Sequence, residues 1–490
     1  MSARHVVAFP NRYYDSVKLM RVSVELESLP GIHAASAVMA TPMNVELLRA
    51  QGFEGQALDA GAETLVVAIA GAGDHDVERA FDRLDELLSS SVAIPGDTTA
   101  GPPRSLEAAL RLHPQANLVV VAVPGQHAAL EAWTALRAGR NVFLFSDNVS
   151  LSDEVKLKQA AASLGLVVMG PDCGTAMLGG IGLGFANRVR AGSIGLVGAS
   201  GTGIQQVSSL IHQAGGGIAA AIGTGSRDLS TEVGGLMTLA GLEMLVADPA
   251  VERIGLISKP ADPDVGSRVL ERLSGSGKPA VACMLGAQPT TAGSMDNLNL
   301  QRAETLTEAA DLLMGREPRK RRFEPRAPGH GEPRRRTGRL AALFAGGTLC
   351  QEAERIVRAL APAAEATFVD VGADEYTRGR AHPMIDPRLR ADMIERSGDE
   401  ADVLLFDVVL GDLAYPDPAG ALIPPVEAAR VRALARGVDL AVYASLIGTD
   451  LDPQGLGRQR SMLTDIGVMV SSSNAEVAEL AGRCLTGTPL

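Results

Sequence analysis

Two glycine-rich turns carry the residues best suited to chemistry in this 490-residue chain. The first reads Gly198-Ala-Ser-Gly-Thr-Gly203, and the second reads Ala345-Gly-Gly-Thr348. Each follows an apolar run and precedes an amphipathic stretch, which predicts strand, turn and helix. Such a turn presents free N–H groups at the positive end of a helix dipole, and glycine lets a phosphate approach. Two matched turns favour a shared anionic ligand, while tight packing of the turns remains the alternative.

We expect an anionic substrate to be held by the hydroxyls and amides of these turns. The expected binding residues are Ser200, Gly201, Thr202, Gly203, Gly346, Gly347 and Thr348. Lys259 follows another apolar run and is expected to clamp the anion, although a solvent-facing strand end explains it equally well. Arg227 precedes Asp228 after a further apolar run, so we expect it at the same edge of a parallel sheet, where ligands gather.

A polar, proline-bounded loop over residues 376–388 supplies the other expected catalytic groups. Arg378 and Arg380 have the geometry to bind a carboxylate bidentately. His382 is expected to move protons, with Asp386 holding its ring. The expected catalytic set is therefore Lys259, Arg380, His382 and Asp386. The alternative interpretation is a surface loop with solvated arginines and a capping aspartate.

A third group of residues marks a further ligand edge, the expected place for CoA if CoA binds. Its members are Pro124, Gly125, Ser146, Asn148, Asp172 and Cys173. Cys173 is either a nucleophile or, as we favour, a small buried apolar residue. The four cysteines lie far apart and show no metal spacing, so we assign no metal ligands. Acidic residues within 407–412 and 450–452 either bind Mg²⁺ together with a phosphate substrate or cap helices.

The elements that must position these residues alternate between strand and helix, which predicts an α/β fold with several doubly wound Rossmann-like or flavodoxin-like domains. Residues 1–95 are expected to form a small α/β sandwich, with strands near 6–9, 35–39 and 65–70. A CoA-binding-like Rossmann domain over 105–190 follows, and Ser152 is expected to cap its helix 153–164. Further domains are expected over 191–315 and 340–490.

Residues 316–339 interrupt this pattern with ten Lys or Arg, three Glu and four Pro. Such a segment repels itself and is typical of an extended interdomain linker. An arm that binds a polyanion is the alternative interpretation.

The composition excludes several function classes. Apolar residues make up 46% and charged residues 21%, as in ordinary folded proteins. A net charge of −12 and only 3% aromatic residues argue against nucleic acid as a partner. The apolar runs fall short of the roughly 20 residues that span a bilayer, and the first residues do not read as a signal peptide. We therefore expect a cytoplasmic protein without membrane contact.

The segment Met169-Gly-Pro-Asp-Cys-Gly-Thr175, followed by the first glycine turn, resembles the succinyl-CoA synthetase α-subunit. The second turn, after Phe344, is similar to the C-terminal domain of its β-subunit. Within the succinyl-CoA synthetase and ATP-citrate lyase superfamily, the chain most resembles the FdrA-type acyl-CoA synthetase-like proteins. The segments that carry this resemblance are 145–158, 169–175, 232–235 and 379–387. It implies an α-type flavodoxin-like domain over 191–315 and a β-type C-terminal domain over 340–490.

The chain departs from the synthetase pattern at the groups that drive its chemistry. Residues 285–297 contain no histidine where the synthetases carry the one that is phosphorylated, and Lys259 stands near the expected carboxylate. No ATP-grasp domain or phosphate-binding G-x-x-x-x-G-K-[ST] loop occurs, and the first glycine-rich turn of a CoA-binding domain is missing. These departures favour a preformed acyl phosphate as substrate.

The resemblance to FdrA-type proteins implies transfer of a carbamoyl group between oxamate and phosphate during purine (allantoin) breakdown. The expected ligands are then an acyl or carbamoyl phosphate and a carboxylate acceptor, with partner subunits or a homodimer. One alternative is an acyl-CoA ligase that uses a separate ATP-grasp subunit. The other is a non-catalytic regulator that binds CoA or phosphate metabolites.

Overall fold

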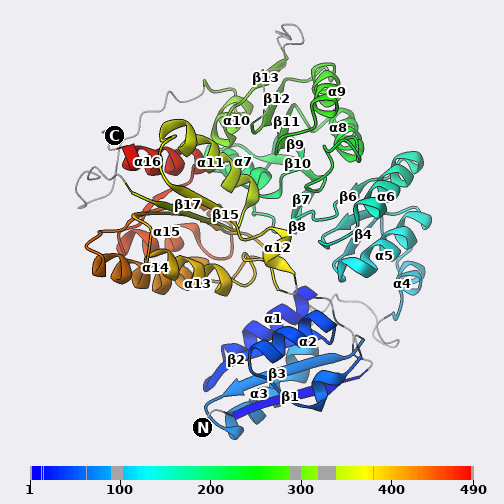
Figure 1. Cartoon of the computed structure of the whole chain (residues 1–490). Coiled ribbons are helices and arrows are strands. Elements are labelled where there is room, and N and C mark those ends of the chain that lie inside the picture. The colour runs from blue at the N-terminus through cyan, green and yellow to red at the C-terminus, as the bar shows by residue number, and fades with distance from the viewer. Residues whose placement is uncertain are drawn as a thin grey trace. The chain divides into compact units, whose positions relative to one another are not determined.

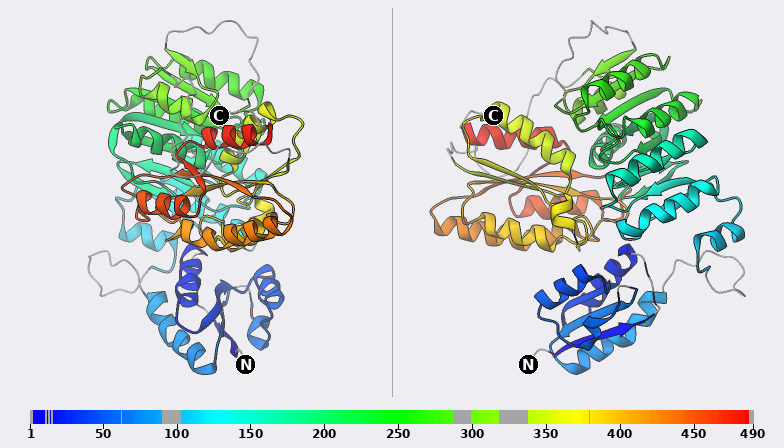
Figure 2. Two further views of the ribbon diagram at one scale, coloured as in Figure 1. Left: turned by 90° about the vertical axis from the view of Figure 1, so that its left-hand side faces the viewer. Right: turned by 45° about the vertical axis from the view of Figure 1, so that its right-hand side comes forward.

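The computed structural model describes residues 3–10, 12, 14, 16–61, 63–89, 103–286, 299–317, 338–378 and 380–486. Its contacts divide the chain into two compact units (Figures 1 and 2). The first comprises Met1–Gln115, Ala122–Ala128 and Arg378–Ala381. The second comprises Ala116–Val121, Ala129–Thr377 and His382–Leu490.

The first unit is built around one antiparallel sheet with the strand order β1-β3-β2. Its elements are β1 (Ala3–Phe9), α1 (Ser16–Glu27), β2 (Ile32–Met39), α2 (Pro42–Ala50), η1 (Gln56–Asp59), β3 (Leu65–Gly71), α3 (Asp74–Ser89) and α4 (Leu106–Leu112). The central strand β3 is buried throughout. Its residues alternate between two cores, since Leu65, Val67 and Ile69 meet α1 and α3, whereas Val66, Ala68 and Ala70 meet α2 and η1. Burial on both faces explains why β3 reads as one apolar run.

The second unit contains a small parallel sheet with the strand order β4-β5-β6. Its elements are β4 (Leu118–Val121), α5 (Gly125–Arg137), β5 (Asn141–Leu144), α6 (Leu151–Leu164) and β6 (Val168–Met169). The N-cap of α6 is Ser150, whose hydroxyl accepts the Asp153 N–H at 3.1 Å. The expectation that Ser152 caps this helix was therefore wrong.

A seven-stranded sheet forms the middle of the second unit, with the strand order β13-β12-β11-β9-β10-β7-β8. Its strands are β7 (Thr175–Leu178), β8 (Ile181–Gly184), β9 (Ala191–Gly198), β10 (Ile218–Gly223), β11 (Arg253–Ser258), β12 (Ala280–Met284) and β13 (Leu300–Arg302). Its helices are α7 (Gly201–Gln213), α8 (Leu236–Ala247), α9 (Pro263–Ser274) and α10 (Leu306–Leu313). Figure 1 shows α7 and α10 on one face of the sheet and α8 and α9 on the other.

The C-terminal part of the second unit is a five-stranded parallel sheet with the order β15-β14-β16-β17-β18. Its strands are β14 (Leu340–Phe344), β15 (Ala366–Asp370), β16 (Val403–Val409), β17 (Ala441–Ile447) and β18 (Met469–Ser471). Its helices are α11 (Gly347–Leu360), α12 (Asp374–Thr377), α13 (Arg388–Ser397), α14 (Pro418–Ala435), α15 (Leu456–Asp465) and α16 (Asn474–Thr486). Figure 1 shows α11 and α16 on one face and α13 and α14 on the other, so the sheet is doubly wound.

The parallel sheets confirm the α/β fold class, but two strands belong elsewhere than the sequence suggested. Residues 175–184 fall within the domain expected over 105–190, but they form β7 and β8, and β7 pairs with β10 in the seven-stranded sheet. Most of the expected linker 316–339 lies outside the described residues, as does the stretch 287–298 that follows β12. The interpretation of that linker stays a prediction.

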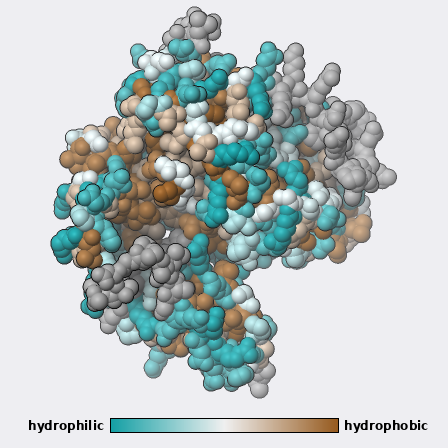
Figure 3. All heavy atoms as spheres, turned by 180° about the vertical axis from the view of Figure 1, so that it is seen from behind, coloured by the Kyte–Doolittle hydropathy of each residue, from teal (hydrophilic) through white to brown (hydrophobic). Residues whose placement is uncertain are grey.

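The described residues contain no helix that is both long and apolar enough to cross a membrane. Hydrophobic residues are interspersed with hydrophilic ones over the face drawn in Figure 3. Such mixing is ordinary, because more than half of a folded protein's surface is apolar.

Candidate functional site

Each of the two glycine turns follows the carboxyl end of a central strand in a parallel part of its sheet. β9 lies between β10 and β11, and β14 lies between β15 and β16, so the chain leaves each central strand once in either direction. A crevice opens beyond the carboxyl ends of the strands at such a switch point. The turn after β9 and Lys259, which follows β11, therefore flank one switch point, and the turn after β14 lies at the other.

The two turns touch each other in the folded chain. The Ser200 and Thr348 hydroxyls lie 2.7 Å apart, and both side chains are buried. Ser200 also caps α7, because its Oγ accepts the Gly203 N–H at 3.1 Å. A Cβ atom placed on Gly346 would lie only 2.8 Å from the Thr202 side chain, so glycine is needed for this close approach. The structure thus joins two segments 148 positions apart.

The second turn is held by a carboxylate from the neighbouring strand. Asp407, in β16, accepts the N–H groups of Ala345 and Gly346, each at 2.8 Å. Arg390 donates to the same carboxylate at 2.5 Å, and both side chains are buried. Burial lowers the pKa of the Arg390 guanidinium. Because Asp407 already takes these two amides, an anion at this turn depends on the first-turn amides of α11, which begins at Gly347.

Lys259 and Asp370 meet beside the start of α11. A Cβ atom on Gly347 would lie 2.2 Å from Oδ2 of Asp370 and 2.9 Å from Nζ of Lys259. Asp370 ends β15, and its Oδ1 accepts the Gly372 N–H at 3.0 Å. Desolvation raises the pKa of Asp370 to about 6, against the opposing attraction of Lys259. A cation and a carboxylate therefore both face the positive end of α11.

A second carboxylate, Asp172, also interacts with Lys259. Desolvation raises the pKa of Asp172 to about 6, while a hydrogen bond from Ser226 and the charge of Lys259 oppose the rise. Asp172 has φ of 54°, an uncommon backbone conformation for a residue other than glycine. Desolvation also raises the pKa of Asp147, whose Oδ2 accepts the Thr377 hydroxyl at 3.4 Å. No carboxylate lies next to Lys259 in the sequence, but the fold places Asp172 and Asp370, from other segments of the chain, near it.

His382 lies close to Asp370 but is not held by Asp386. Its Nδ1 accepts the Met384 N–H at 3.2 Å, which leaves Nε2 to carry the proton of the neutral ring. Desolvation and the charge of Arg390 lower the pKa of His382 to about 4. Asp386 instead pairs with Arg388, at 2.7 Å. The expected Asp386–His382 pair was wrong, because the adjacent arginine takes the carboxylate.

Arg378 and Arg380 are both exposed, and Gly379 between them is outside the described residues. The segment Arg378–Ala381 belongs to the first unit. The assignment of these arginines to a carboxylate pocket stays a prediction.

Arg227 is partly exposed and pairs with a buried ion network. Its Nε donates to Glu154 at 2.8 Å, and a second nitrogen donates to the Val149 carbonyl at 2.8 Å. Fully buried Lys158 donates to Glu154 at 2.8 Å and to Asp228 at 2.9 Å. This network connects α6 with the loop after β10, and the phosphate-binding role of Arg227 stays a prediction.

The remaining residues of the expected ligand edge have ordinary structural environments. Cys173 is buried, and desolvation raises its pKa to about 12, so the buried interpretation is confirmed and a thiolate nucleophile is disfavoured. Ser146 is buried, with its hydroxyl 3.4 Å from the Val121 carbonyl. Asn148 is exposed with φ of 53°. Pro124 precedes α5, which begins at Gly125.

The acidic residues considered for Mg²⁺ are occupied by protein partners. Asp412 pairs with Arg188 at 2.9 Å, and Asp450 accepts from His212 at 2.6 Å. Asp452 accepts the Arg188 and Thr449 N–H groups at 2.7 and 2.8 Å. Within the described part of the chain, no group of three or more His, Cys, Asp or Glu is arranged to hold a metal ion.

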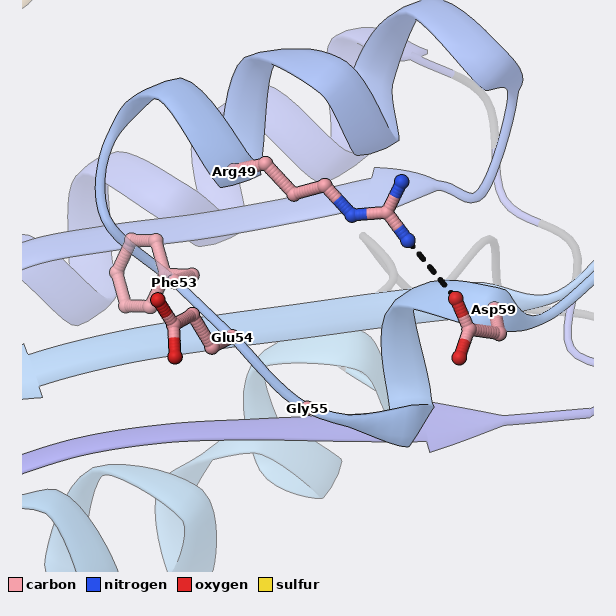
Figure 4. A pocket seen from close by; sticks show the side chains of 5 residues that line it. All are labelled: Arg49, Phe53, Glu54, Gly55 and Asp59. Atoms are coloured by element: carbon pink, nitrogen blue, oxygen red, sulfur yellow. Dashed lines mark hydrogen bonds and ion pairs between the residues drawn. The ribbon is translucent and has the colours of Figure 1, made fainter.

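The first unit carries a separate open hollow of about 400 Å³ (Figure 4). It is lined by Arg49, Phe53, Glu54, Gly55 and Asp59. Arg49 and Asp59 form an ion pair at 2.8 Å across it, and both side chains are largely exposed. Because its only cation is already paired with a carboxylate of the same hollow, we assign it no function.

Sequence reasoning missed Asp370 and the capping role of Asp407. Both are aspartates in apolar strands, and in the sequence such a residue cannot be told from an aspartate at an ordinary strand end. Only the order of strands in the sheet places Asp370 and Asp407 on either side of the turn after β14.

Comparison with known proteins identifies three segments. The CoA-binding domain model matches residues 189–284, and the CoA-ligase model matches residues 343–484. The first match lies on the expected α-type domain, not on 105–190. A third model, described as AllF, heavy metal-associated domain, matches residues 1–101. That segment contains no cysteine, and its described residues include no group of three or more His, Cys, Asp or Glu arranged to hold a metal ion.

Individual proteins are also similar to this chain, two of them over less than half of it and one over nearly its whole length. Succinate–CoA ligase (ADP-forming) subunit alpha-2 of Trichomonas vaginalis is 28% identical over 35% of this chain and 57% of that protein. ATP citrate lyase of Methanothrix soehngenii, solved with citrate and coenzyme A, is 16% identical with a TM-score of 0.35, over 46% of this chain and 44% of that one. The uncharacterized protein YahF of Escherichia coli (strain K12) is 39% identical, and the alignment covers 97% of each chain. This chain therefore belongs to the same family as YahF, and it contains segments that match the CoA-binding and CoA-ligase domain models.

Proposed function

We propose that this chain is a group transferase acting on an acyl or carbamoyl phosphate, with a carboxylate-bearing acceptor such as oxamate. One observation carries the proposal: the starts of α7 and α11 meet at the Ser200–Thr348 contact, with Lys259 beside them. Two positive helix ends of about half a charge each, together with an ammonium, attract a phosphate group. The resemblance to FdrA-type proteins supports carbamoyl as the transferred group.

In this proposal the phosphate is bound by the first-turn amides of both helices and by Lys259. Amides of this kind also stabilise the oxyanion that forms when a nucleophile attacks the carbonyl. A mixed anhydride is already activated, so positioning of the two substrates supplies much of the acceleration. We also propose that the chain works with a partner subunit or as a homodimer.

The test is calorimetric titration of the purified chain with carbamoyl phosphate. We expect binding to the wild type and about tenfold or more weaker binding to Lys259→Ala, because a cation next to the phosphate is lost. Lys156→Ala, which removes an exposed lysine from α6, is the matched control and should bind like the wild type. If Lys259→Ala bound carbamoyl phosphate as tightly as the wild type does, the proposed role of Lys259 in phosphate binding would be wrong.

A second candidate is an acyl-CoA ligase completed by a separate ATP-grasp subunit. The match of the CoA-binding domain model to residues 189–284 favours it. CoA titrated in parallel distinguishes the two, since CoA binding without carbamoyl phosphate binding supports the ligase. Binding of CoA with no turnover by the chain and any partner would point to the regulatory alternative.

A further inference from the structure

One carboxylate oxygen of Asp370 is held by a backbone N–H, and the other lies near the start of α11. Its Oδ1 accepts the Gly372 N–H at 3.0 Å. Its Oδ2 reaches over the turn after the adjacent strand, to 2.2 Å from where a Cβ atom of Gly347 would lie. Within the described residues, no side chain forms an ion pair or hydrogen bond with Asp370. The oxygen nearest the start of α11 is therefore available to exchange a proton.

Two glycines make this placement sterically possible. A side chain at Gly347 would collide with Asp370 and Lys259. A Cβ atom on Gly372 would lie 2.6 Å from Nε2 of His382 and 3.2 Å from Oδ1 of Asp370. The carboxylate is thus bordered by the Lys259 ammonium on one side and the His382 ring on the other.

The neighbouring titratable groups are less suited to proton exchange at this point. His382 uses Nδ1 to accept the Met384 N–H, so the neutral ring has no free basic nitrogen to offer. Asp172 also interacts with Lys259, but its carboxylate is already hydrogen-bonded by Ser226. Asp407 is fully engaged by two amides and Arg390. Asp370 is the carboxylate that combines closeness to α11 with an oxygen free of side-chain partners.

We propose that Asp370 is the general base and acid of the site, carrying a proton from the acceptor nitrogen to the departing phosphate. This inference rests on the proposed function. The acceptor nitrogen attacks the carbonyl carbon of carbamoyl phosphate, a C–N bond forms, and the C–O bond to phosphate breaks. The nitrogen loses one proton to Asp370, and Asp370 passes it to the phosphate, so the carboxylate is regenerated and no other reactant is consumed.

The surroundings of Asp370 suit this role. Desolvation raises its pKa to about 6, close to the neutral range where a catalytic acid and base works best. The charged groups that face it are Lys259 after β11, Asp407 in β16 and Glu375 in α12, with the neutral His382 ring beside it. Because the base form is needed, kcat/KM should rise with pH through an ionisation near 6 and then level off.

The experiment compares Asp370→Asn, Asp172→Asn and Asp374→Asn with the wild type, each with its partner present if one is required. Asp374 is an exposed carboxylate on α12 and serves as the matched control. We measure the rate of carbamoyl transfer as a function of pH. We also measure the binding of sulfate, a tetrahedral dianion that does not itself titrate. Calorimetry of sulfate binding in two buffers of different ionisation enthalpy gives the number of protons taken up. We expect Asp370→Asn to lower kcat by about 10²–10⁴-fold and to keep sulfate binding. The rise of kcat/KM with pH near 6 should be absent from this variant.

Proton uptake on sulfate binding gives a readout independent of turnover. A dianion beside Asp370 favours its protonated form, so the wild type should take up protons near pH 6.5, and Asp370→Asn should take up clearly fewer. Asp370→Glu keeps the carboxylate and should retain uptake, which guards against a variant that misfolds.

The outcomes separate this inference from the proposed function. If Asp370→Asn binds sulfate and transfers the group within a few-fold of the wild type, Asp370 is not the base and the proposed function survives. A loss confined to Asp172→Asn would also overturn the inference. If the wild type neither binds sulfate nor uses carbamoyl phosphate, the proposed function fails, and the inference fails with it.

Discussion

The two glycine turns have the same strand–turn–helix form but are held in different ways. The turn before α7 is capped by its own Ser200, a neutral hydroxyl that follows β9. The turn before α11 has glycine at its N-cap and is held by Asp407 from β16, which Arg390 balances. The first turn therefore depends on local sequence, and the second depends on a neighbouring strand. Similar sequence motifs can present similar amides while relying on different supports.

The two turns also differ in how much space surrounds the first residue of the helix that follows, Gly201 in α7 and Gly347 in α11. A Cβ atom on Gly201 would meet Thr175 at an ordinary 3.4 Å, whereas one on Gly347 would lie 2.2 Å from Asp370. The α11 side of the site is thus crowded with charged groups, and the α7 side is not. We expect the α11 side, where Lys259 and Asp370 lie, to contribute most to both phosphate binding and the chemistry.

The largest expected effect comes from the support of the second turn. Asp407→Asn leaves the buried Arg390 guanidinium without its counter-charge, which should lower the free energy of unfolding by about 3–5 kcal/mol. Urea denaturation measures the loss. Asp412→Asn breaks the exposed pair with Arg188 and should cost less than about 1 kcal/mol. Equal losses in the two variants would mean that Asp407 does not support the turn as described.

Next in size is the contrast between Gly347→Ala and Gly201→Ala. The first forces Asp370 and Lys259 apart and should weaken carbamoyl phosphate binding about tenfold, or about 1.4 kcal/mol. The second meets only an ordinary contact and should bind within about twofold of the wild type. Calorimetry on both variants checks this. If Gly201→Ala were the weaker binder, the crowded side would not be the functional one.

A pH effect on stability tests the environment of Asp370. The unfolded carboxyl has a pKa of about 3.9, and the folded one is raised to about 6, so the folded state binds the proton more tightly. The ionised group therefore destabilises the fold above pH 6, and this penalty fades as the pH falls from about 6 to 4. Asp370→Asn should raise the free energy of unfolding by about 1 kcal/mol at pH 7.5 and change it little at pH 4.5. A constant difference across that range would contradict the raised pKa.

The smallest expected effect is the coupling between the two turns. Ser200→Ala removes a helix cap at a cost of about 1 kcal/mol, and Thr348→Val removes the other hydroxyl of the 2.7 Å contact. A double-mutant cycle on unfolding should give a coupling of about 0.5–1 kcal/mol. Additive losses would show that the contact contributes nothing beyond its separate parts.

Much of the site could be predicted from residue types and spacing. Both glycine turns were named residue by residue, and the structure brings them together through Ser200 and Thr348. Lys259 was expected beside an anion site and lies by the start of α11. The strand–turn–helix form was foreseen because a turn between a buried strand and a helix is a local feature that its own residues encode. The anion-binding roles of the turns and of Lys259 stay predictions.

Sequence reasoning did not foresee which charged side chains pair with each other, whether the partner is distant in the sequence or close by. The partner of Arg227 was not foreseen: it pairs with Glu154, on a helix 73 positions earlier. Asp386 was paired with His382 but is taken by Arg388. Spacing along the chain cannot rank competing charge partners, because the choice depends on which side chains the fold leaves within reach.

The sequence by itself determined the α/β class, the parallel apolar strands and the two turns, since hydrophobic periodicity and glycine placement act over a few residues. Only the tertiary structure decided that Asp370, Asp172 and His382 share the neighbourhood of Lys259, and that Asp407 supports the second turn. Strand order in a parallel sheet is set by packing of whole units against one another. That order decides which loop ends meet at a switch point, so no local pattern reveals it.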